Sequence, residues 1–524
     1  MADEKQKVDL NKTKTDLLGL DKDEKAQLIR IQQDYQFYIG CYTKEDRDKY
    51  SNFVQNDMLG QTWFLSEDKL DYIPSVVVDN KVSELIGKQA RFFLGVPPYL
   101  LFKLKDNNIG GDNSHDKDKL ERFRVFIDSI LDDNQFWSNM LKAFRLATVT
   151  KRILLRIEAN PGEDIKLYYH DVCDFNYRTD KQGRLVEVKF VTYIGYDETK
   201  EKEMFKRFTY FLVDNMRDET NTEIKCRLKE EYFYHDDLEN PFDESEVETI
   251  YSRIPAVVFI NEPDLFEPSG KSDVTLLKGL QNQYNRKLSD FSDALRFQMF
   301  GNTTFIDATE ETVNVCKIAP NSVFAVETTD EAKEHNMQAQ VHRTESSFSN
   351  AEPVMSYLQM LRDSMGDKLA IPKKDELKEV PSAKALKFIY NDLIARCHEK
   401  WQDWEPGIFT IIDLIIESCS KLNIYEDFQT EWLNLEYTML LKKNFPIPDD
   451  EEDAKRLAME EVNNNVRSHR NYLKDYGTEE DYNEAFKEIV EDLQIINESE
   501  MDPISKSLVL EQQKNNSNLE NGDE

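Results

Sequence analysis

The spacing of apolar residues changes character twice along the chain. Up to residue 146, apolar side chains recur near the 3.6-residue period of an amphipathic helix, which predicts helices over residues 21–39, 75–93 and 120–146. Between residues 148 and 260, short runs alternate apolar and polar positions between polar turns, a pattern typical of an antiparallel sheet. From residue 272 the helical period returns. The pattern therefore predicts an α+β protein with a sheet region between helical ones.

A narrow apolar stripe runs along the helix predicted over residues 272–300. Its members are spaced by three or four positions: Leu277, Leu280, Tyr284, Leu288, Phe291 and Leu295. A stripe this narrow is typical of a helix that packs on one partner helix or on copies of itself. Further helices are predicted over 351–369 and over 383–422, where Pro406-Gly407 should kink or break the helix.

The remaining segments are mixed or polar. Strand-like pieces at 303–306 and 323–326 interrupt residues 301–350, and acidic helices are predicted over 449–463, 469–473 and 479–496. Residues 1–20 and 501–524 have polar sequences and are predicted to be disordered.

Net charge limits how the protein can contact nucleic acid. The 524 residues include 67 basic and 101 acidic side chains, for a net charge of −34. A protein that grips DNA by its phosphates needs a basic face, so we expect at most weak, non-specific contacts from local lysines. Six scattered cysteines without a CxxC pair indicate a reducing compartment. The first residues lack a signal-peptide pattern, and the most apolar run is too short for a membrane span, so we expect a soluble protein made in a cytoplasm.

Possible catalytic and metal motifs are incomplete. Ser269-Gly270-Lys271-Ser272 contains the end of a phosphate-binding loop, but the required first glycine is Leu265. The acidic loop over 106–119 has neither the glycine nor the final glutamate of a calcium loop. Histidines beside aspartates, as at His170 and His235, could bind a metal, but turns at strand ends explain them more simply. Trp401 and Trp404 could form a ligand-stacking site, but we expect them to pack in the core or at a subunit interface. We expect no catalytic residues, no metal and no cofactor.

Four phrases, in this order, resemble those of the portal proteins of long-tailed bacteriophages. They are VSELIGK through FLGVP within residues 82–97, SRIPAVVF at 252–259, KSD followed by L, YN and LSD within 271–290, and PSAKALK at 381–387. Ala383 stands where the family usually has glycine. The resemblance runs from roughly residue 25 to residue 500, and it concerns a structural family without catalytic residues.

The resemblance implies an elongated portal subunit with an antiparallel β-sheet wing, a helical stem, a small mixed clip, and a long helix leading to a helical crown. The implied regions are a disordered N-terminus (1–20), the wing (21–265), the first stem helix (266–300), the clip (301–350), the second stem helix (351–369), the tunnel loop (370–382), the long kinked wing helix (383–422), the crown (423–500) and a disordered tail (501–524).

The family's function is a conduit for double-stranded DNA during packaging and ejection. The resemblance implies a homo-oligomeric ring of roughly twelve copies at one vertex of the capsid. Implied partners are the terminase large subunit, a head-completion or connector protein, and the major capsid and scaffold proteins. The protein would then reside in the virion after assembly in the host cytoplasm, without contact with a membrane.

Lysines of the implied tunnel loop are the candidates for DNA contact. A conduit should repel phosphates along most of its wall, because each phosphate contact resists sliding. A few lysines at the narrowest point can still make weak, exchangeable contacts. The candidates in the loop are Lys373, Lys374 and Lys378, followed on the next helix by Lys384 and Lys387. Alternatively, these lysines are solvated and partly paired with the acidic residues at 375, 376 and 379.

Two other functions remain open from the sequence. One is a different ring-forming structural or adaptor protein of the virion. The other is a metal- or nucleotide-dependent hydrolase, for which the chain shows no complete motif.

Overall fold

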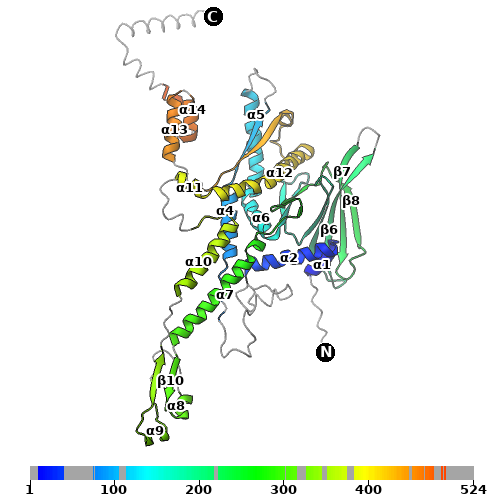
Figure 1. Cartoon of the computed structure of the whole chain (residues 1–524). Helices are drawn as coiled ribbons and strands as arrows, with labels where there is room; N and C mark the ends of the chain where they lie inside the picture. Colours follow the sequence, from blue (N-terminus) through cyan, green and yellow to red (C-terminus); the bar gives the residue numbers. More distant parts are fainter. Residues whose placement is uncertain are drawn as a thin grey trace, which may run out of the picture. The chain divides into compact units, whose positions relative to one another are not determined.

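The computed structural model of the chain contains both helices and antiparallel sheets (Figure 1). It describes residues 10–40, 75, 77–105, 114–216, 222–300, 302–315, 326–344, 351–373, 383–447, 451–464, 466–476, 486–487 and 489–490. The chain divides into two compact units. The first is Met1–Lys378 with Ile389–Pro446, and the second is Glu379–Phe388 with Ile447–Glu524. The predicted α+β class is confirmed.

The described helices that precede the sheets are α1 (Leu10–Leu17), α2 (Lys22–Ile39), α4 (Lys81–Leu94), α5 (Ser114–Asp133) and α6 (Phe136–Thr150). Helix α2 begins with a capping box, in which Asp21 and Glu24 each accept a hydrogen bond from the other's backbone N–H at 2.8 Å. The helix predicted over 120–146 is two helices, because the chain turns at Gln135, whose φ is +48°. Helix α5 includes residues 114–119. This part of the acidic segment over 106–119 is therefore helical and does not form a calcium loop.

Helix α4 begins later than the apolar spacing predicts. The prediction began at Ser75, but the helix begins at Lys81, after Asn80, whose side chain accepts a hydrogen bond from the N–H of Ser83 at 3.0 Å. The valines at 76–78 favour an extended backbone. In addition, the N–H groups of Ser75, Val77 and Asp79 are bonded to side chains of helix α7, as described below, so they are not available to a helix.

Two antiparallel sheets follow, as predicted. Their strands are β2 (Arg152–Glu158), β3 (Lys166–His170), β4 (Phe175–Thr179), β5 (Leu185–Asp197), β6 (Lys202–Met216), β7 (Thr222–Tyr234), β8 (Asp243–Glu248) and β9 (Ala256–Ile260). One sheet has the order β3-β2-β9 and the other β4-β5-β6-β7-β8. Alternation puts Phe190 and Val188 of β5 on a buried face, at 1% and 0% exposure.

Residues 10–20 are folded, which corrects the prediction that residues 1–20 are disordered. Leu17 and Leu18, at the end of α1, are 1% and 0% exposed and pack against Val191, Phe205 and Phe233 of the five-stranded sheet. The prediction relied on overall polarity. Two adjacent leucines are enough to dock a short helix on an apolar sheet face, because burying each contributes roughly 1.5–3 kcal/mol.

A two-stranded ribbon joins distant parts of the first unit. Strand β1 (Tyr99–Leu104) pairs antiparallel with β12 (Tyr437–Lys442), next to the 3-10 helix η3 (Thr430–Asn434). Residues 423–446 therefore do not belong to the helical region predicted over 423–500. An alternating run of six residues, YTMLLK, is too short for its strand period to be recognised among flanking helical signals.

Helices α7 (Asp273–Phe300) and α10 (Ala351–Lys368) lie side by side (Figure 1). The elements between them are β10 (Asn302–Ile306), α8 (Glu310–Val315), α9 (Asp330–Glu334) and β11 (Gln340–Thr344), and β10 pairs with β11. The two predicted helices and the predicted strand at 303–306 are confirmed. The piece at 323–325 lies outside the described residues.

The long helix predicted over 383–422 is interrupted at Tyr390, between α11 (Ala383–Ile389) and α12 (Asn391–Leu422). The break expected at Pro406-Gly407 is absent, and α12 continues through Pro406. Packing on β9 on both sides of the proline holds the helix: Trp404 Nε1 donates to the Ile260 carbonyl at 3.1 Å, and Gly407 lets the Phe259 ring approach. Trp401 and Trp404 are core residues, at 1% and 0% exposure.

The described part of the second unit is helical beyond residue 450. Helices α13 (Glu451–Asn463) and α14 (His469–Tyr476) pack on each other, with Ala458 and Val462 buried. They confirm the acidic helices predicted over 449–463 and 469–473. The helix predicted over 479–496 lies mostly outside the described residues, and the tail over 501–524 lies wholly outside them.

Candidate functional site

Helix α7 buries a row of polar side chains beside its apolar stripe. Gln281, Asn285 and Ser289 are each 0% exposed, and Asp293 is 4% exposed. The spacing of four places them on one side of the helix. Burying four polar groups is costly unless each finds a hydrogen-bond partner, so the neighbouring backbone must supply donors.

Those donors are alternate backbone N–H groups of the extended segment before α4. The N–H of Ser75 lies 3.1 Å from Asp293, that of Val77 2.9 Å from Ser289, that of Asp79 3.2 Å from Asn285, and that of Lys81 2.9 Å from Gln281. Four residues of a helix rise about 6.0 Å, and two residues of an extended segment span about 6.6 Å. Every fourth side chain of α7 therefore lies opposite every second N–H group of the segment. We call these four residue pairs the α7 ladder.

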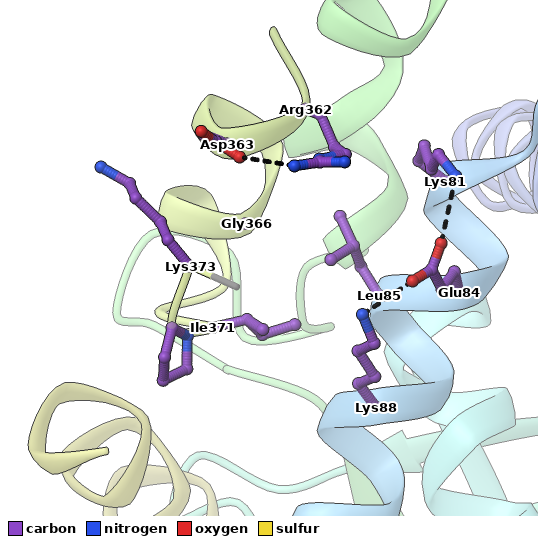
Figure 2. Close-up of a pocket in the computed structure, with 10 residues that line it drawn as sticks. Lys81, Glu84, Leu85, Lys88, Arg362, Asp363, Gly366, Ile371 and Lys373 are labelled. Atoms are coloured by element: carbon purple, nitrogen blue, oxygen red, sulfur yellow. Dashed lines mark hydrogen bonds and ion pairs between the residues drawn. The ribbon is translucent and has the colours of Figure 1, made fainter. Parts of the chain in front are cut away.

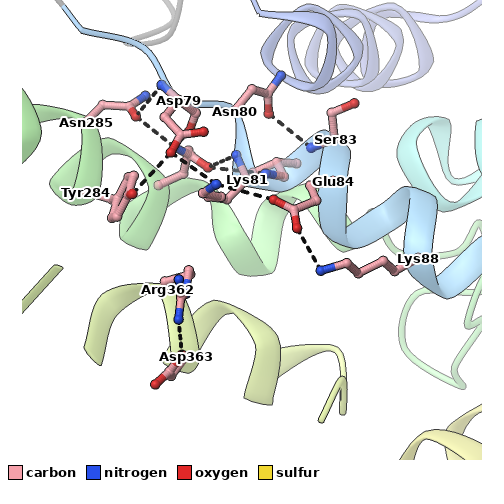
Figure 3. A network of polar contacts seen from close by, with 12 residues as sticks. Asp79, Asn80, Lys81, Ser83, Glu84, Lys88, Tyr284, Asn285, Arg362 and Asp363 are labelled. Atoms are coloured by element: carbon pink, nitrogen blue, oxygen red, sulfur yellow. Dashed lines mark hydrogen bonds and ion pairs between the residues drawn. The ribbon is translucent and has the colours of Figure 1, made fainter. Parts of the chain in front are cut away.

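The Gln281 amide does for this segment what a neighbouring strand would do. Its Oε1 accepts from the N–H of Lys81, and its Nε2 donates to the carbonyl of Asp79 at 2.8 Å. Figure 3 shows the region, with Asp79 lying between Asn285 and Tyr284. The ladder thus fixes the backbone that leads into α4.

A chain of charged groups continues from the ladder along α4. The Tyr284 hydroxyl donates a hydrogen bond of 3.1 Å to the carboxylate of Asp79. The Lys81 ammonium lies 3.1 Å from Asp79 and 3.3 Å from Glu84. Burial alone would lower the pKa of Lys81, but the bond to Asp79 and the two negative charges outweigh it and raise the pKa. The bond from Lys88, 2.7 Å long, lowers the pKa of Glu84. Both groups therefore stay charged at neutral pH.

The chain of charges ends at a small pocket between α4 and the end of α10 (Figure 2). The pocket encloses about 40 Å³ and is lined by Lys81, Glu84, Leu85, Lys88, Arg362, Asp363, Gly366, Ile371, Pro372 and Lys373. This volume holds a few water molecules but no nucleotide or substrate of comparable size. The pocket is thus a polar junction and not a catalytic cleft.

Two basic groups on the α10 side of the pocket each lie near a carboxylate. Lys373 Nζ is 3.5 Å from Asp367 Oδ2, and its side chain is 40% exposed. Arg362, which is half-buried, lies 3.6 Å from Asp363. A partly exposed ion pair at such a distance contributes little energy, so Lys373 can exchange Asp367 for another anionic partner. A phosphate oxygen is one such partner.

Five lysines were predicted to contact DNA. Of these, Lys373 lines the pocket. Lys374 and Lys378 lie outside the described residues, as does the side chain of Lys384. Lys387 lies on α11, in the second unit, and is exposed. The cluster of five DNA-contacting lysines therefore stays a prediction.

The predicted stripe of α7 is partly an internal contact. Leu277 is fully buried in a core with Phe37, Ile86 and Met365, and Leu280 and Tyr284 pack against that core. Farther along the helix, Leu288 and Phe291 are half-buried and Leu295 is 39% exposed. Sequence reasoning missed the ladder because it followed apolar periodicity. A repeat of Gln, Asn, Ser and Asp at a spacing of four was the available signal.

A buried ion cluster anchors the start of α7. Lys400 Nζ lies 2.6 Å from Asn261 Oδ1, 2.9 Å from Glu262 Oε1 and 3.3 Å from Asp273 Oδ2. Lys400 is 1% exposed and Asp273 0%. The cluster joins the end of β9 to both α7 and α12.

The partial phosphate-loop motif has a structural explanation. Gly270 has φ +86°, and a Cβ there would lie 2.6 Å from Ile260 and 2.9 Å from the Lys151 carbonyl. Lys271 pairs with Asp264. The glycine thus serves a close approach of two backbones.

Within the described ranges, no group of three or more His, Cys, Asp and Glu side chains is placed to hold a metal ion. Among the helices that the structure describes, none has the length and apolar character needed to cross a bilayer.

Comparison with known proteins supplies the identity. The family model described as "Phage portal protein, SPP1 Gp6-like" matches residues 19–499, which include all of the helices and strands described above except α1. No curated protein matches the chain significantly. The matched family is structural rather than enzymatic. The chain therefore belongs to the phage portal protein family, in its SPP1 Gp6-like branch.

Proposed function

We propose that the protein forms a homo-oligomeric ring at one capsid vertex and that double-stranded DNA passes through this ring during packaging and ejection. The family match over residues 19–499 carries the proposal. The incomplete motifs and the small size of the α4–α10 pocket are consistent with a structural role.

The regions of the chain follow from this assignment. We assign the wing to residues 21–265, the two stem helices to α7 and α10, and the clip to residues 301–350 between them. The tunnel loop is assigned to 370–382, the long wing helix to α11 and α12, and the crown to the helices beyond residue 450. The terminase large subunit and later a connector protein would dock on the clip, and the major capsid and scaffold proteins would be further partners. The ring would reside in the virion after assembly in the host cytoplasm.

Electrostatics favours a conduit over a DNA-gripping protein. A net charge of −34 repels phosphates, which keeps sliding friction low. Lys373, whose side chain is 40% exposed and whose Nζ lies 3.5 Å from Asp367, can make a weak contact that breaks as DNA advances. We assign the same role to Lys374 and Lys378, and a possible supporting role to Lys384 and Lys387.

Electron microscopy of the purified full-length chain tests the ring. We expect closed rings with an axial channel as wide as a DNA duplex. Filaments, compact dimers or rings with a closed centre would contradict the proposal.

Packaging assays test the lysines. A variant with Lys373, Lys374 and Lys378 changed to Ala should form normal rings but package or retain DNA differently. The control replaces Lys166, Lys181 and Lys200, three exposed lysines of the sheet region, by Ala, which gives the same change in charge. Unchanged packaging and retention in the first variant would remove the loop assignment and leave the ring intact. Lys384→Ala with Lys387→Ala tests the helix candidates in the same way.

A further inference from the structure

The β1–β12 ribbon has one buried face and one exposed face. On the buried face, Leu100 and its partner Leu441 are 3% and 7% exposed, and Phe102 contacts Phe123 of α5 at a ring distance of 5.3 Å. On the other face, Leu101 lies directly opposite Leu440, and they are 36% and 44% exposed. The outer face therefore presents an apolar pair to solvent.

Three lysines surround this apolar pair. The outer face consists of Tyr99, Leu101, Lys103 and Lys105 from the β1 side and Glu436, Thr438, Leu440 and Lys442 from the β12 side, all of them exposed. Three lysines and one glutamate give this face a net charge of +2 on a chain of −34. Among the described residues, Lys103 and Lys442 have no ion-pair partner within 4 Å. An apolar centre with a charged rim is the usual anatomy of a protein interface.

We propose that the outer face of the β1–β12 ribbon binds an acidic surface of a second copy of the chain. This inference rests on the proposed function, because a ring requires two different surfaces of neighbouring copies to meet. Copies that each carry −34 repel one another, so their contacts must bring unpaired cations against acidic side chains. The ribbon has such cations in Lys103 and Lys442. They lie beside Leu101 and Leu440, whose burial in a contact would contribute favourable free energy.

Duplex DNA fits this face less well than a protein surface does. Lysines alone would suit phosphates, but a phosphate backbone cannot bury the Leu101–Leu440 pair or Tyr99. A second copy satisfies both requirements, since its surface supplies carboxylates together with apolar side chains. The chain has 101 acidic residues from which such a surface can be formed.

Assembly of the full-length protein, measured by mass photometry over a range of concentrations, tests the inference. Leu101→Asp with Leu440→Asp, and separately Lys103→Glu with Lys442→Glu, should raise the concentration for half-assembly by roughly tenfold or more. Val247→Asp, at an apolar residue of β8 that is 59% exposed, is the control for the first variant. Lys181→Glu with Lys200→Glu is the control for the second. Circular dichroism establishes that each variant is folded.

The outcomes separate this inference from the proposed function. If both ribbon variants form rings at the wild-type concentration, the ribbon is not the contact, although the ring stands. If the wild-type chain forms no ring, the proposed function and this inference fail together. If the lysine variant assembles normally but loses affinity for duplex DNA, the occupant is DNA and the inference is wrong.

Cross-linking gives a direct readout. A carbodiimide joins lysine amines to carboxylates that lie in contact, and rings assembled from isotope-labelled and unlabelled copies distinguish links between copies. We expect mixed-isotope links from Lys103 or Lys442 to Asp or Glu. Links confined to single copies would overturn the inference.

Discussion

Ser289 accepts a hydrogen bond from the backbone N–H of Val77 at 2.9 Å, across 212 positions of sequence. This bond is one rung of the α7 ladder, which holds the extended segment before α4 without a neighbouring strand. Because the acceptors are side chains, each rung can be removed by a single substitution. The ladder is therefore open to direct measurement.

Ser289→Ala should destabilise the protein by about 1–3 kcal/mol, because the part-buried N–H of Val77 loses its acceptor. Urea unfolding followed by circular dichroism measures the change. Ser292→Ala, on the same helix but outside the row, should change stability by less than about 0.5 kcal/mol. Equal effects of the two substitutions would mean that the rung contributes no more than helix propensity does.

Lys400→Met should destabilise the protein by about 1–3 kcal/mol, because Asp273 and Glu262 lose one of their two cations. Arg396, which lies 3.2 Å from Asp273 and 2.6 Å from Glu262, remains. Lys421→Met on the same helix is the control: Lys421 pairs with Glu417 at 2.7 Å, but its side chain is 44% exposed, so its loss should cost less than about 1 kcal/mol. Thermal unfolding of both variants makes the comparison. A Lys400→Met variant as stable as wild type would show that the cluster is dispensable for folding.

Gly407→Ala and Gly279→Ala should have effects of opposite sign. A Cβ at Gly407 would lie 2.7 Å from the Phe259 ring, so Ala there should destabilise by about 1–3 kcal/mol. A Cβ at Gly279 of α7 meets nothing within 4 Å, so Ala there should stabilise the helix by about 0.5–1 kcal/mol. Differential scanning calorimetry of the two variants checks both signs. A stabilising Gly407→Ala would contradict the close packing of β9 on α12.

Stability should fall as the pH drops from about 6.5 to about 4. Burial, aided by the charge of Arg156, lowers the pKa of His170 to about 4, whereas an unfolded histidine titrates near about 6.5. As the pH falls, the unfolded chain takes up this proton first, so the folded state loses up to about 3 kcal/mol from this group. Carboxylates also make stability depend on pH in this range. The contribution of His170 is therefore measured by comparing variants.

His170→Gln should reduce the loss of stability between pH 7 and pH 4.5, as measured by urea unfolding at a series of pH values. His342→Gln, at an exposed histidine, is the control and should leave the pH dependence as in wild type. An identical pH profile for His170→Gln and wild type would exclude His170 as the source.

Much of the fold could be predicted from spacing alone. The period of two residues found the sheet region, and the period of 3.6 found α2, α7, α10 and α13, because these elements bury one regular apolar side. The start of α4 was misplaced because its valines fit a helical stripe equally well, and only the α7 ladder decides for the extended form. Helix α1 was missed because two leucines in a polar stretch carry little periodicity.

The candidate site was harder to predict. Lys373 was chosen from the family resemblance, and the structure adds its distance of 3.5 Å from Asp367. The neighbours Lys81, Glu84 and Arg362 come from helices far apart in sequence, so no local pattern could join them. The α7 ladder depends on contacts across about two hundred positions, and polar periodicity alone would not have distinguished a buried row from a solvated one.

The pairing of β1 with β12 has a consequence for synthesis on the ribosome. Strand β1 is complete at Leu104, yet its partner strand ends at Lys442, and Asn444 bonds to Pro97 across 347 positions. During translation β1 therefore has no partner strand until nearly the whole first unit has emerged from the ribosome. A chain that stops before Tyr437 leaves that strand unpaired and prone to aggregate. Chains truncated before Tyr437 should therefore fail to accumulate as soluble protein, so that the chains available for assembly are those with a complete β1–β12 ribbon.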